Sequence, residues 1–324
     1  MKPKKIALLT SGGDAPGMNA AIRAIVRAAL NFEMKVIGIN RGFDGLLSCD
    51  IMEMNARSVS DIIHKGGTIL RTARCPELET EEGLDKAAGI CKVLKLDCLV
   101  VIGGNGSLQG ALELSKRGVS VIGIPGTIDM DVNCSDYSIG FDTAINTAMD
   151  AINKIRDTSN SHERCSVVEV MGRRSGYIAL WSSITGGAEE VLIPESSEEE
   201  NSAEWVVGQI VENRALGKRH NLIVVAEGVG GSVALAKEIE RITGIESRAT
   251  ILGHLQRGGS PTAVDRMHAA YMGYKAVECI QNNEVNRIIV FRNGKHESID
   301  ITEALSLERP YDDTMHKIVR LLAR

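Results

Sequence analysis

The segment PGTIDMD, residues 125–131, holds two acidic side chains at a spacing that suits phosphoryl transfer. It follows the apolar run SVIGI, which predicts a buried strand, and it places Asp129 and Asp131 two residues apart. An extended backbone would put both carboxylates on one side of the chain. One acid could then accept a proton from a hydroxyl group while the other holds Mg²⁺. A turn with solvated acids is the alternative interpretation of the same residues.

Glycine-rich turns follow apolar runs at other points of the chain. LLTSGGDAPGMNAAIR has Gly12-Gly13 between an apolar run and a helical pattern, and VVIGGNGSLQGA has Gly103-Gly104 in the same position. Such turns let the backbone approach a phosphate closely, and parallel strands bring their carboxyl ends to one edge of a sheet. The second turn carries an amide, Asn105, where a carboxylate would suit magnesium better. The P-loop pattern GxxxxGK[ST] does not occur in the sequence.

Basic residues in the second half of the chain could neutralise an anionic ligand. The segments SHER, MGRR, ESR and GHLQRGG contain Arg164, Arg173, Arg248, His254 and Arg257. A guanidinium fork matches a phosphate monoester, although a single surface arginine is usually only solvated. In the first predicted helix Arg23 and Arg27 are four residues apart, so they share a face and could form a separate anion site or only interact with neighbouring residues.

Short apolar runs alternate with amphipathic helical patterns along the chain. MNAAIRAIVRAALNF and DTAINTAMDAINKIRDT have apolar residues at helical spacing. Strands are predicted at residues 5–10, 35–39, 98–102, 120–124, 166–170, 221–227 and 286–291. This alternation predicts an α/β fold with mainly parallel sheets and helices on both faces, and 324 residues favour two domains.

Composition narrows the class of function. Aromatic residues make up 3% of the chain and the formal net charge is −5, so we expect no nucleic-acid partner. The 7 cysteines form no CxxC pair, which is typical of free thiols in a reducing compartment. The first residues, MKPKKIALLTSGGD, contain only a short apolar stretch, so neither a signal peptide nor a membrane span is expected. We therefore expect a cytoplasmic protein without a membrane partner.

The motifs LTSGGDAPGMNAAIR, GGTILRTARCPE, PGTIDMD, SHERCSVVEVMGR and ATILGHLQRGGSP closely resemble those of bacterial ATP-dependent 6-phosphofructokinases, from about residue 4 to near the end. The resemblance implies two Rossmann-like three-layer domains with mainly parallel sheets and an active site in the crevice between them. It implies a larger ATP-binding domain, residues 1–140 plus 256–310, and a smaller fructose 6-phosphate-binding domain, residues 141–255 plus 311–324. It also implies a glycolytic homotetramer with shared sites that moves the γ-phosphoryl group of ATP to the 1-hydroxyl of fructose 6-phosphate.

The resemblance also implies roles for single residues. Catalytic roles fall on Asp129, the base, and on Thr127, Arg173, Arg74 and Gly13. The ATP site would comprise Gly13, Arg74, Cys75, Gly104, Asn105, Gly106 and Ser107. The sugar phosphate would contact Thr127, Ile128, Asp129, Arg164, Met171, Gly172, Arg173, Glu227, Arg248, His254 and Arg257, with Arg164 and Arg248 reaching a neighbouring subunit's site.

Metal and effector sites are implied in the same way. Mg²⁺ would bind at Asn105 and Asp131. An effector, ADP or phosphoenolpyruvate, would bind at Arg23, Arg27, Arg156, Gly187, Glu189, Lys218 and His220. Leu216 stands where the family usually has a basic residue.

The chain departs from the family pattern on the ATP side. Asn105 replaces the aspartate of GGDGS, Met130 stands where PGTIDND has asparagine, and Glu79 stands where relatives carry a basic residue. Gly106 and Gly126 remain glycine, unlike in pyrophosphate-dependent relatives, which makes ATP the expected donor.

Several interpretations remain open. One is an active kinase, in which Asn105→Asp should lower the magnesium requirement and raise turnover. Another is a catalytically weakened paralogue that serves as a sugar-phosphate-binding regulatory subunit. A lipid or NAD kinase shares a similar glycine-rich turn, but it would not explain PGTIDMD or LGHLQRGGSP.

Overall fold

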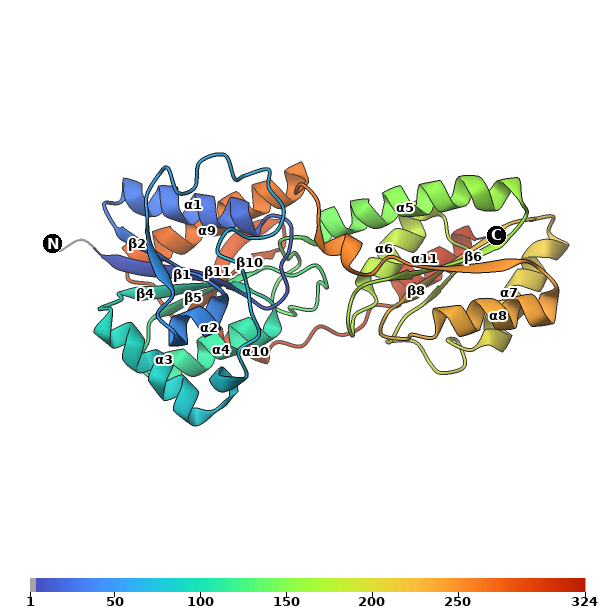
Figure 1. Ribbon diagram of the computed structural model, residues 1–324. Helices are drawn as coiled ribbons and strands as arrows, with labels where there is room; N and C mark the ends of the chain where they lie inside the picture. The colour runs from blue at the N-terminus through green and yellow to red at the C-terminus, as the bar shows by residue number, and fades with distance from the viewer. Residues whose placement is uncertain (1–3, 324) are drawn as a thin grey trace. The chain divides into compact units, whose positions relative to one another are not determined.

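The computed structural model describes residues 4–323 and divides the chain into two compact units. Unit 1 comprises Met1–Thr143 and Arg257–Arg309, and unit 2 comprises Ala144–Gln256 and Pro310–Arg324. Each unit has its own sheet with helices on both faces (Figure 1). The predicted α/β class with mainly parallel sheets is therefore confirmed.

Unit 1 contains a 7-stranded sheet in the order β11-β10-β5-β4-β1-β2-β3. Its inner strands are parallel, and the edge strands β3 and β11 are antiparallel to their neighbours. The strands are β1 Lys5–Ser11, β2 Lys35–Ile39, β3 Ile51–Met54, β4 Cys98–Gly103, β5 Val121–Pro125, β10 Arg287–Arg292 and β11 Lys295–Asp300.

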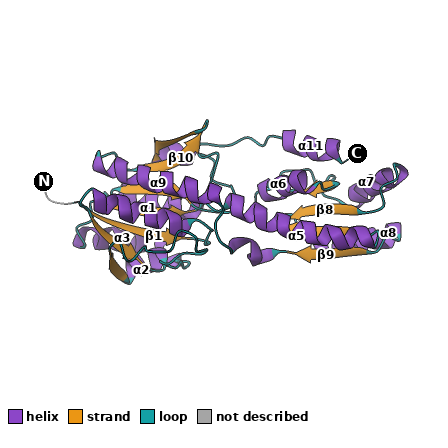
Figure 2. Ribbon diagram, turned by 90° about the horizontal axis from the view of Figure 1, so that it is seen from above, coloured by secondary structure: helices purple, strands orange, loops and turns teal. Residues whose placement is uncertain are grey.

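The helices of unit 1 cover both faces of this sheet. In Figures 1 and 2, α1 and α9 lie side by side on one face, and Figure 1 shows α2, α3 and α4 on the other. Gly273 lets α1 and α9 approach closely, because a Cβ there would lie 2.8 Å from the Cβ of Ala24. The helices are α1 Met18–Asn31, α2 Gly42–Leu47, the 3₁₀ turn η1 Pro76–Glu79, α3 Glu81–Val93, α4 Asn105–Lys116, α9 Ala263–Gln281 and α10 Ile301–Ser306.

Unit 2 contains a 4-stranded parallel sheet in the order β7-β8-β6-β9. Apolar side chains of α7 and α8 pack against one face of it, and Figure 1 shows α5, α6 and α11 on the other. The strands are β6 Cys165–Val170, β7 Glu190–Leu192, β8 Asn221–Ala226 and β9 Ser247–Ile251. The helices are α5 Phe141–Ser161, whose first turn holds the unit boundary, α6 Tyr177–Gly186, α7 Ala203–Ala215, α8 Ser232–Thr243, the 3₁₀ turn η2 Gly253–Arg257 and α11 Thr314–Leu322.

Burial explains which strands the sequence pattern predicts. All residues of β4 and β8 are buried, so they read as continuous apolar runs, and all seven predicted strands are confirmed within about one residue. Strands β3, β7, β9 and β11 were not predicted. β7 has only 3 residues, and the other three are edge strands with mixed polar and apolar residues.

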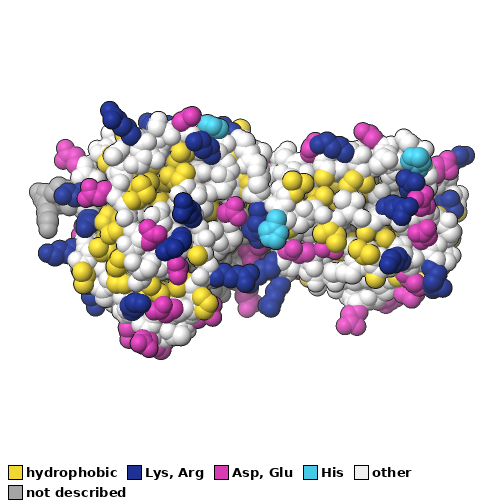
Figure 3. All heavy atoms as spheres, in the orientation of Figure 1, with side chains coloured by type: hydrophobic (Ala, Val, Ile, Leu, Met, Phe, Trp, Pro, Cys, Tyr) yellow, Lys and Arg dark blue, Asp and Glu magenta, His cyan; other side chains and the backbone are white. Residues whose placement is uncertain are grey.

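The surface of both units mixes charges of both signs. In the face drawn in Figure 3, lysine and arginine side chains alternate with acidic ones, and small hydrophobic areas lie between them. Within residues 4–323, no helix has the length and apolar character needed to cross a membrane.

Candidate active site

Three glycine-rich turns of unit 1 meet at the carboxyl edge of the sheet. Their strands β1, β4 and β5 are neighbours, and the last residues Ser11, Gly103 and Pro125 are register partners. The turns also touch, because the backbone N–H of Gly126 donates to the carbonyl oxygen of Gly103 at 2.9 Å. Convergence of the three turns, which the strand pattern predicts, is therefore confirmed in unit 1.

The amide of Asn105 links two of these turns. Asn105 is the first residue of α4, and its Nδ2 donates to the carbonyl oxygen of Asp131 at 2.7 Å. Within the second turn, the Oγ1 of Thr127 accepts the N–H of Asp129 at 3.2 Å, and both side chains are buried. The sequence-predicted residues Asn105, Thr127, Asp129 and Asp131 thus lie in one connected group of backbone and side-chain contacts.

The backbone between the two acids is not extended. Met130 has φ 57, in the left-handed region, and the chain bends at residues 128–129. The expectation that the segment between the two acids is extended is therefore wrong. The spacing rule for strands does not apply here because β5 has already ended at Pro125.

Gly13 and Arg257, assigned to different ligands by the resemblance, touch each other in unit 1. A Cβ added at Gly13 would lie 2.4 Å from the Nη1 of Arg257, which itself donates to the carbonyl oxygen of Asp14 at 3.3 Å. The absence of a side chain at position 13 therefore leaves room for the guanidinium group. This places a cation beside the first glycine-rich turn.

The segment 66–75 runs beside the same turn. The hydroxyl of Thr72 donates to the carbonyl oxygen of Gly12 at 2.6 Å, and Thr10 and Thr68 share a hydrogen bond of 2.9 Å. Arg74 is exposed and Cys75 is half-buried. Burial raises the pKa of the Cys75 thiol, so this cysteine is neutral near pH 7 and is suited to contact rather than to nucleophilic attack.

The two glycines that bear on donor choice have different surroundings. A Cβ at Gly106 would meet no atom within 4 Å, so the space beside the start of α4 is open. A Cβ at Gly126 would lie 3.0 Å from the Cγ2 of Ile102 and 3.3 Å from the Cε of Met18. Gly106 therefore leaves room for a ligand, whereas Gly126 is also required by packing.

In unit 2, a carboxylate and a buried amide hold the loop that carries Arg173. The Oε1 of Glu227 accepts the backbone N–H groups of Gly172 at 3.2 Å and Arg173 at 2.6 Å. The Oε1 of the fully buried Gln256 accepts the N–H of Met171 at 2.7 Å. Arg173 itself is exposed and has φ 57. Its guanidinium is thus presented by a loop that these two side chains fix.

Arg164 and Arg248, predicted to hold a phosphate, share one carboxylate. Glu246 accepts the Nε of Arg164 at 2.7 Å and the Nη2 of Arg248 at 2.5 Å. Hydrogen bonding to Arg164 lowers the pKa of Glu246, which keeps the carboxylate charged at neutral pH. His254 is exposed on η2. Unit 2 therefore contains a cation pair that is already held in place by an anion.

The predicted effector residues fall in both units. In unit 2, the Nη2 of Arg156 donates to the carbonyl oxygen of Gly187 at 2.6 Å, and the Nζ of Lys218 lies 3.3 Å from the Oε1 of Glu189. His220 is half-buried in the same unit. The remaining two residues, Arg23 and Arg27, lie on α1 of unit 1.

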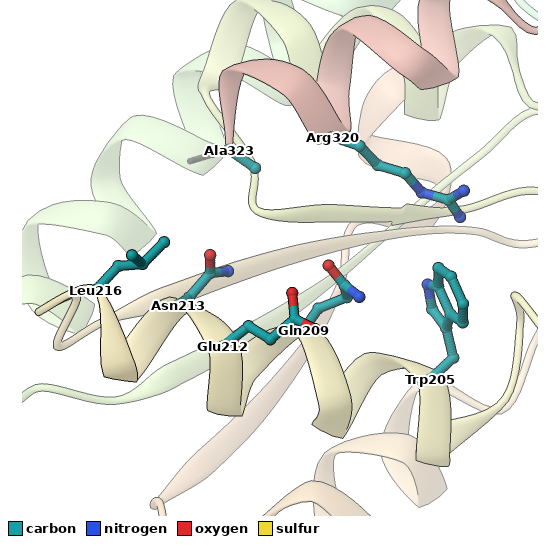
Figure 4. Close-up of a pocket in the computed structure, with 7 residues that line it drawn as sticks. All are labelled: Trp205, Gln209, Glu212, Asn213, Leu216, Arg320 and Ala323. Carbon is teal, nitrogen blue, oxygen red and sulfur yellow. The ribbon is translucent and has the colours of Figure 1, made fainter.

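A separate pocket of about 190 Å³ lies between α7 and α11 of unit 2 (Figure 4). Figure 4 shows Gln209 and Glu212 projecting from α7 toward α11, and Arg320 extending toward Trp205, whose ring centre is 4.9 Å from the guanidinium carbon. The pocket includes Leu216 but none of the predicted catalytic or substrate residues. It is therefore separate from the predicted catalytic and substrate residues, but it adjoins the predicted effector residues, because Lys218 donates a hydrogen bond to the carbonyl oxygen of Ala323.

Sequence reasoning missed three residues that organise these sites. Glu246 begins the segment ESR and Gln256 lies in ATILGHLQRGGSP, so their position in these motifs was the only signal in the sequence that pointed to them. Asp265 is fully buried and accepts the hydroxyl of Tyr137 and the N–H of Gly140, each at 2.6 Å. Burial raises the pKa of Asp265, and these hydrogen bonds oppose the rise. Nothing in the sequence around Asp265 distinguishes this residue from a solvated acid.

Comparison with known proteins gives a consistent result. The family model described as phosphofructokinase matches residues 5–280. ATP-dependent 6-phosphofructokinases of Clostridium botulinum and Clostridium acetobutylicum are each 56% identical over 321 residues, covering 99% of this chain and 100% of theirs.

Solved structures share the fold. Phosphofructokinase from Pichia pastoris matches with a TM-score of 0.89 and 34% identity over 94% of this chain and 36% of that one. Phosphofructokinase from Saccharomyces cerevisiae matches with a TM-score of 0.85 and 33% identity over 93% of this chain and 45% of that one. This chain therefore spans less than half of the yeast chain. A pyrophosphate-dependent phosphofructokinase from Marinobacter aquaeolei matches with a TM-score of 0.82 over 99% of this chain and 91% of that one. The two sequences are 19% identical, so this match shows the fold alone.

Proposed function

The chain belongs to the phosphofructokinase family, and we propose that it transfers the γ-phosphoryl group of ATP to the 1-hydroxyl of fructose 6-phosphate, giving fructose 1,6-bisphosphate and ADP. It is an enzyme, an ATP-dependent phosphotransferase. The observation that carries the detailed proposal is the contact between Asn105 and Asp131, which joins a phosphate-binding turn to the acidic turn. Phosphoryl transfer depends mainly on positioning and charge neutralisation, and this contact serves positioning.

Asp129 is the base in this proposal. Its carboxylate accepts the proton of the attacking hydroxyl, and Thr127 flanks the transferring group and holds the turn through its contact with the N–H of Asp129. The backbone at Gly13 and at residues 104–107 receives the phosphates of ATP, with Arg74 and Cys75 at the nucleotide. The open space at Gly106 supports ATP as the donor.

Mg²⁺ fits the donor set that unit 1 offers. Asp131 and the amide oxygen of Asn105 would hold it, and both are oxygen ligands of the kind that magnesium prefers. No cluster of three or more His, Cys, Asp or Glu side chains that could hold a metal occurs among residues 4–323, which agrees with a cation that takes its other ligands from phosphate and water. When bound, Mg²⁺ would neutralise negative charge on the phosphates of ATP.

The sugar phosphate is recognised from unit 2 in this proposal. Arg173 stabilises the charge of the transferring group, and its loop, residues 171–173, contacts the sugar together with Glu227 and His254. Arg164 and Arg248 bind the 6-phosphate of a neighbouring subunit's substrate, and Arg257 of unit 1 is a further sugar contact. The shared carboxylate of Glu246 supports a common site for the two arginines.

Assembly and regulation complete the proposal. The enzyme forms a homotetramer with shared sites in the cytoplasm, and ADP or phosphoenolpyruvate binds at the effector residues. The paired contacts Arg156–Gly187 and Lys218–Glu189 support a common effector site for these four residues.

The test is a coupled assay for fructose 1,6-bisphosphate with purified protein, Mg²⁺ and either ATP or pyrophosphate. Formation of the bisphosphate with ATP, and little with pyrophosphate, is the expected result. Faster turnover with pyrophosphate would overturn the donor assignment. Binding of fructose 6-phosphate without turnover would favour the weakened paralogue.

A further inference from the structure

Asn105 does something that the aspartate usual at this position in the family cannot do: it donates a hydrogen bond. Its Nδ2 reaches the carbonyl oxygen of Asp131, 26 residues further along the chain, at 2.7 Å. The bond joins the start of α4 to the turn that follows β5. A carboxylate has only acceptor oxygens near neutral pH, so it would face the carbonyl oxygen without a hydrogen between them.

The turn that receives this bond contains a strained residue. Met130 has φ 57, a left-handed conformation that is energetically unfavourable for a residue other than glycine. Asparagine and glycine adopt this conformation more readily than methionine. Strain of this kind persists only where surrounding contacts hold the backbone in place.

Contacts on both sides of Met130 supply that restraint. Before it, the hydroxyl of Ser138 donates to the carbonyl oxygen of Thr127 at 2.8 Å, and Ser138 Oγ also lies 3.6 Å from the Sδ of the buried Met130. After it, the bond from Asn105 fixes the carbonyl group of Asp131. The turn is therefore held at its two ends, and the second end depends on an amide N–H₂ group.

We propose that Asn105 is a positioning residue whose amide N–H₂ group clamps the Asp129–Asp131 turn, and that the clamp is required because position 130 is methionine. The bond uses Nδ2, so the oxygen Oδ1 is still available as a cation ligand. An amide can fill both roles at once, whereas a carboxylate can serve only as the ligand. Only the catalytic consequence of this inference rests on the proposed function; the clamp itself does not.

A clamp and a metal ligand at position 105 predict opposite effects of Asn105→Asp on turnover. If position 105 matters only as a magnesium ligand, Asn105→Asp should raise turnover and lower the magnesium concentration needed. If the clamp is the main role, Asn105→Asp should lower kcat about tenfold at saturating substrates and Mg²⁺, because Asp129 lies within the released turn. The KM for fructose 6-phosphate should change less than about threefold, since the base acts in the transition state.

Amide hydrogen exchange tests the clamp without ATP, sugar or metal. Exchange of the peptide covering residues 126–133 should become faster in Asn105→Asp and in Asn105→Ala, while exchange in α8 stays unchanged. Gln109→Glu is the matched control, because it makes the same amide-to-acid change at an exposed position of the same helix. Asn105→Ala keeps the test valid if the aspartate variant fails to fold.

Variants that also carry Met130→Asn test whether the clamp is required because residue 130 is methionine. Met130→Asn should relieve the strain, so adding Asn105→Asp to it should lower kcat less than about threefold, compared with about tenfold in the parent. Unchanged exchange at residues 126–133 in both Asn105 variants would overturn the clamp, whether or not the parent is active. Equal losses of kcat in the two backgrounds would overturn the link to Met130. An inactive parent with faster exchange in the variants would contradict the proposed function and leave the clamp supported.

Discussion

The Oε1 of Glu227 accepts the backbone N–H of Arg173 at 2.6 Å, and Arg173 has φ 57. The carboxylate therefore holds a left-handed residue whose guanidinium group is proposed to act on the transferring phosphoryl group. The same oxygen also accepts the N–H of Gly172. Glu227 thus fixes the direction in which the loop presents its cation.

Replacing Glu227 should distinguish this positioning role from a role of its charge. Glu227→Ala leaves two backbone N–H groups without their acceptor, and kcat/KM for fructose 6-phosphate should fall about 10–100-fold. Glu227→Gln retains an acceptor oxygen and should cost less than about fivefold. Steady-state kinetics check both, with the exposed Glu240→Ala as control. Equal losses in the alanine and glutamine variants would show that the charge, not the acceptor, matters.

Asp129→Asn should remove the proposed base while keeping the shape of the buried side chain. Turnover should fall about 10²–10⁴-fold, the usual range for a positioned acid or base, with little change in the KM for fructose 6-phosphate. The coupled assay measures this, and Asp61→Asn, at a side chain that is 82% exposed, is the control. Near-normal turnover in Asp129→Asn would exclude this residue as the base.

Arg248→Ala should weaken binding of the sugar phosphate rather than slow the chemical step. We expect the KM for fructose 6-phosphate to rise about 10–100-fold, the range that a charge-assisted hydrogen bond to phosphate provides. The loss should shrink when fructose replaces fructose 6-phosphate. Arg241→Ala is the matched control, because Arg241 is also an exposed arginine of unit 2 paired with a glutamate. Equal losses for both sugars would argue against contact with the 6-phosphate.

Gly13→Ala should lower activity without unfolding the protein. The new Cβ would lie 2.4 Å from the Nη1 of Arg257, so the guanidinium group must move away from the first turn. Displacement of a positioning group by about 1 Å can cost up to about 100-fold in rate, whereas the melting temperature should change little because Gly13 is exposed. Gly89→Ala, where a Cβ meets nothing within 4 Å, should change neither activity nor fold. Full activity in Gly13→Ala would show that Arg257 is not needed in this position.

Stability should depend on pH through a histidine pair in unit 1. The Nδ1 of His268 and the Nε2 of His296 are 3.0 Å apart, and His268 stacks on Tyr137 at 3.9 Å. Burial, followed by the effect of His296, lowers the pKa of His268 to about 4, which the nearby Asp142 only partly opposes. Burial also lowers the pKa of His296.

The sign follows from the proton balance. Histidine in an unfolded chain has a pKa of about 6.5, so below that pH the unfolded state takes up protons that the folded state refuses. The contribution of the neutral histidines to the free energy of unfolding should therefore be fully present above about pH 6.5. It should decrease as the pH falls toward about 4. His268→Phe keeps a ring on Tyr137 but cannot bind a proton, and it should flatten the decrease of the urea midpoint between about pH 7 and about pH 5. The exposed His162→Phe should not. The same slope in parent and His268→Phe would contradict this account.

The sequence by itself determined the seven interior strands of the two sheets, the turns that follow them and the residue types that these turns carry. The runs in β1, β4 and β5 are apolar because both faces of the sheet are covered, so these strands can be recognised as continuous apolar segments of the sequence. Since neighbouring parallel strands end at one edge of a sheet, the convergence of the turns at Gly12, Gly103 and Gly126 followed from the predicted strands. The chemistry of PGTIDMD was visible for the same reason.

Only the tertiary structure decided how the side chains of these turns contact one another. Asn105 and Asp131 are 26 residues apart, and Arg164 and Glu246 are 82 apart, so no local periodicity connects them. Their bonds depend on where packing of the helices fixes each turn to within a few tenths of an ångström. The left-handed conformation of Met130 is of the same kind, because methionine has no preference for it and contacts from Asn105 and Ser138 supply the restraint.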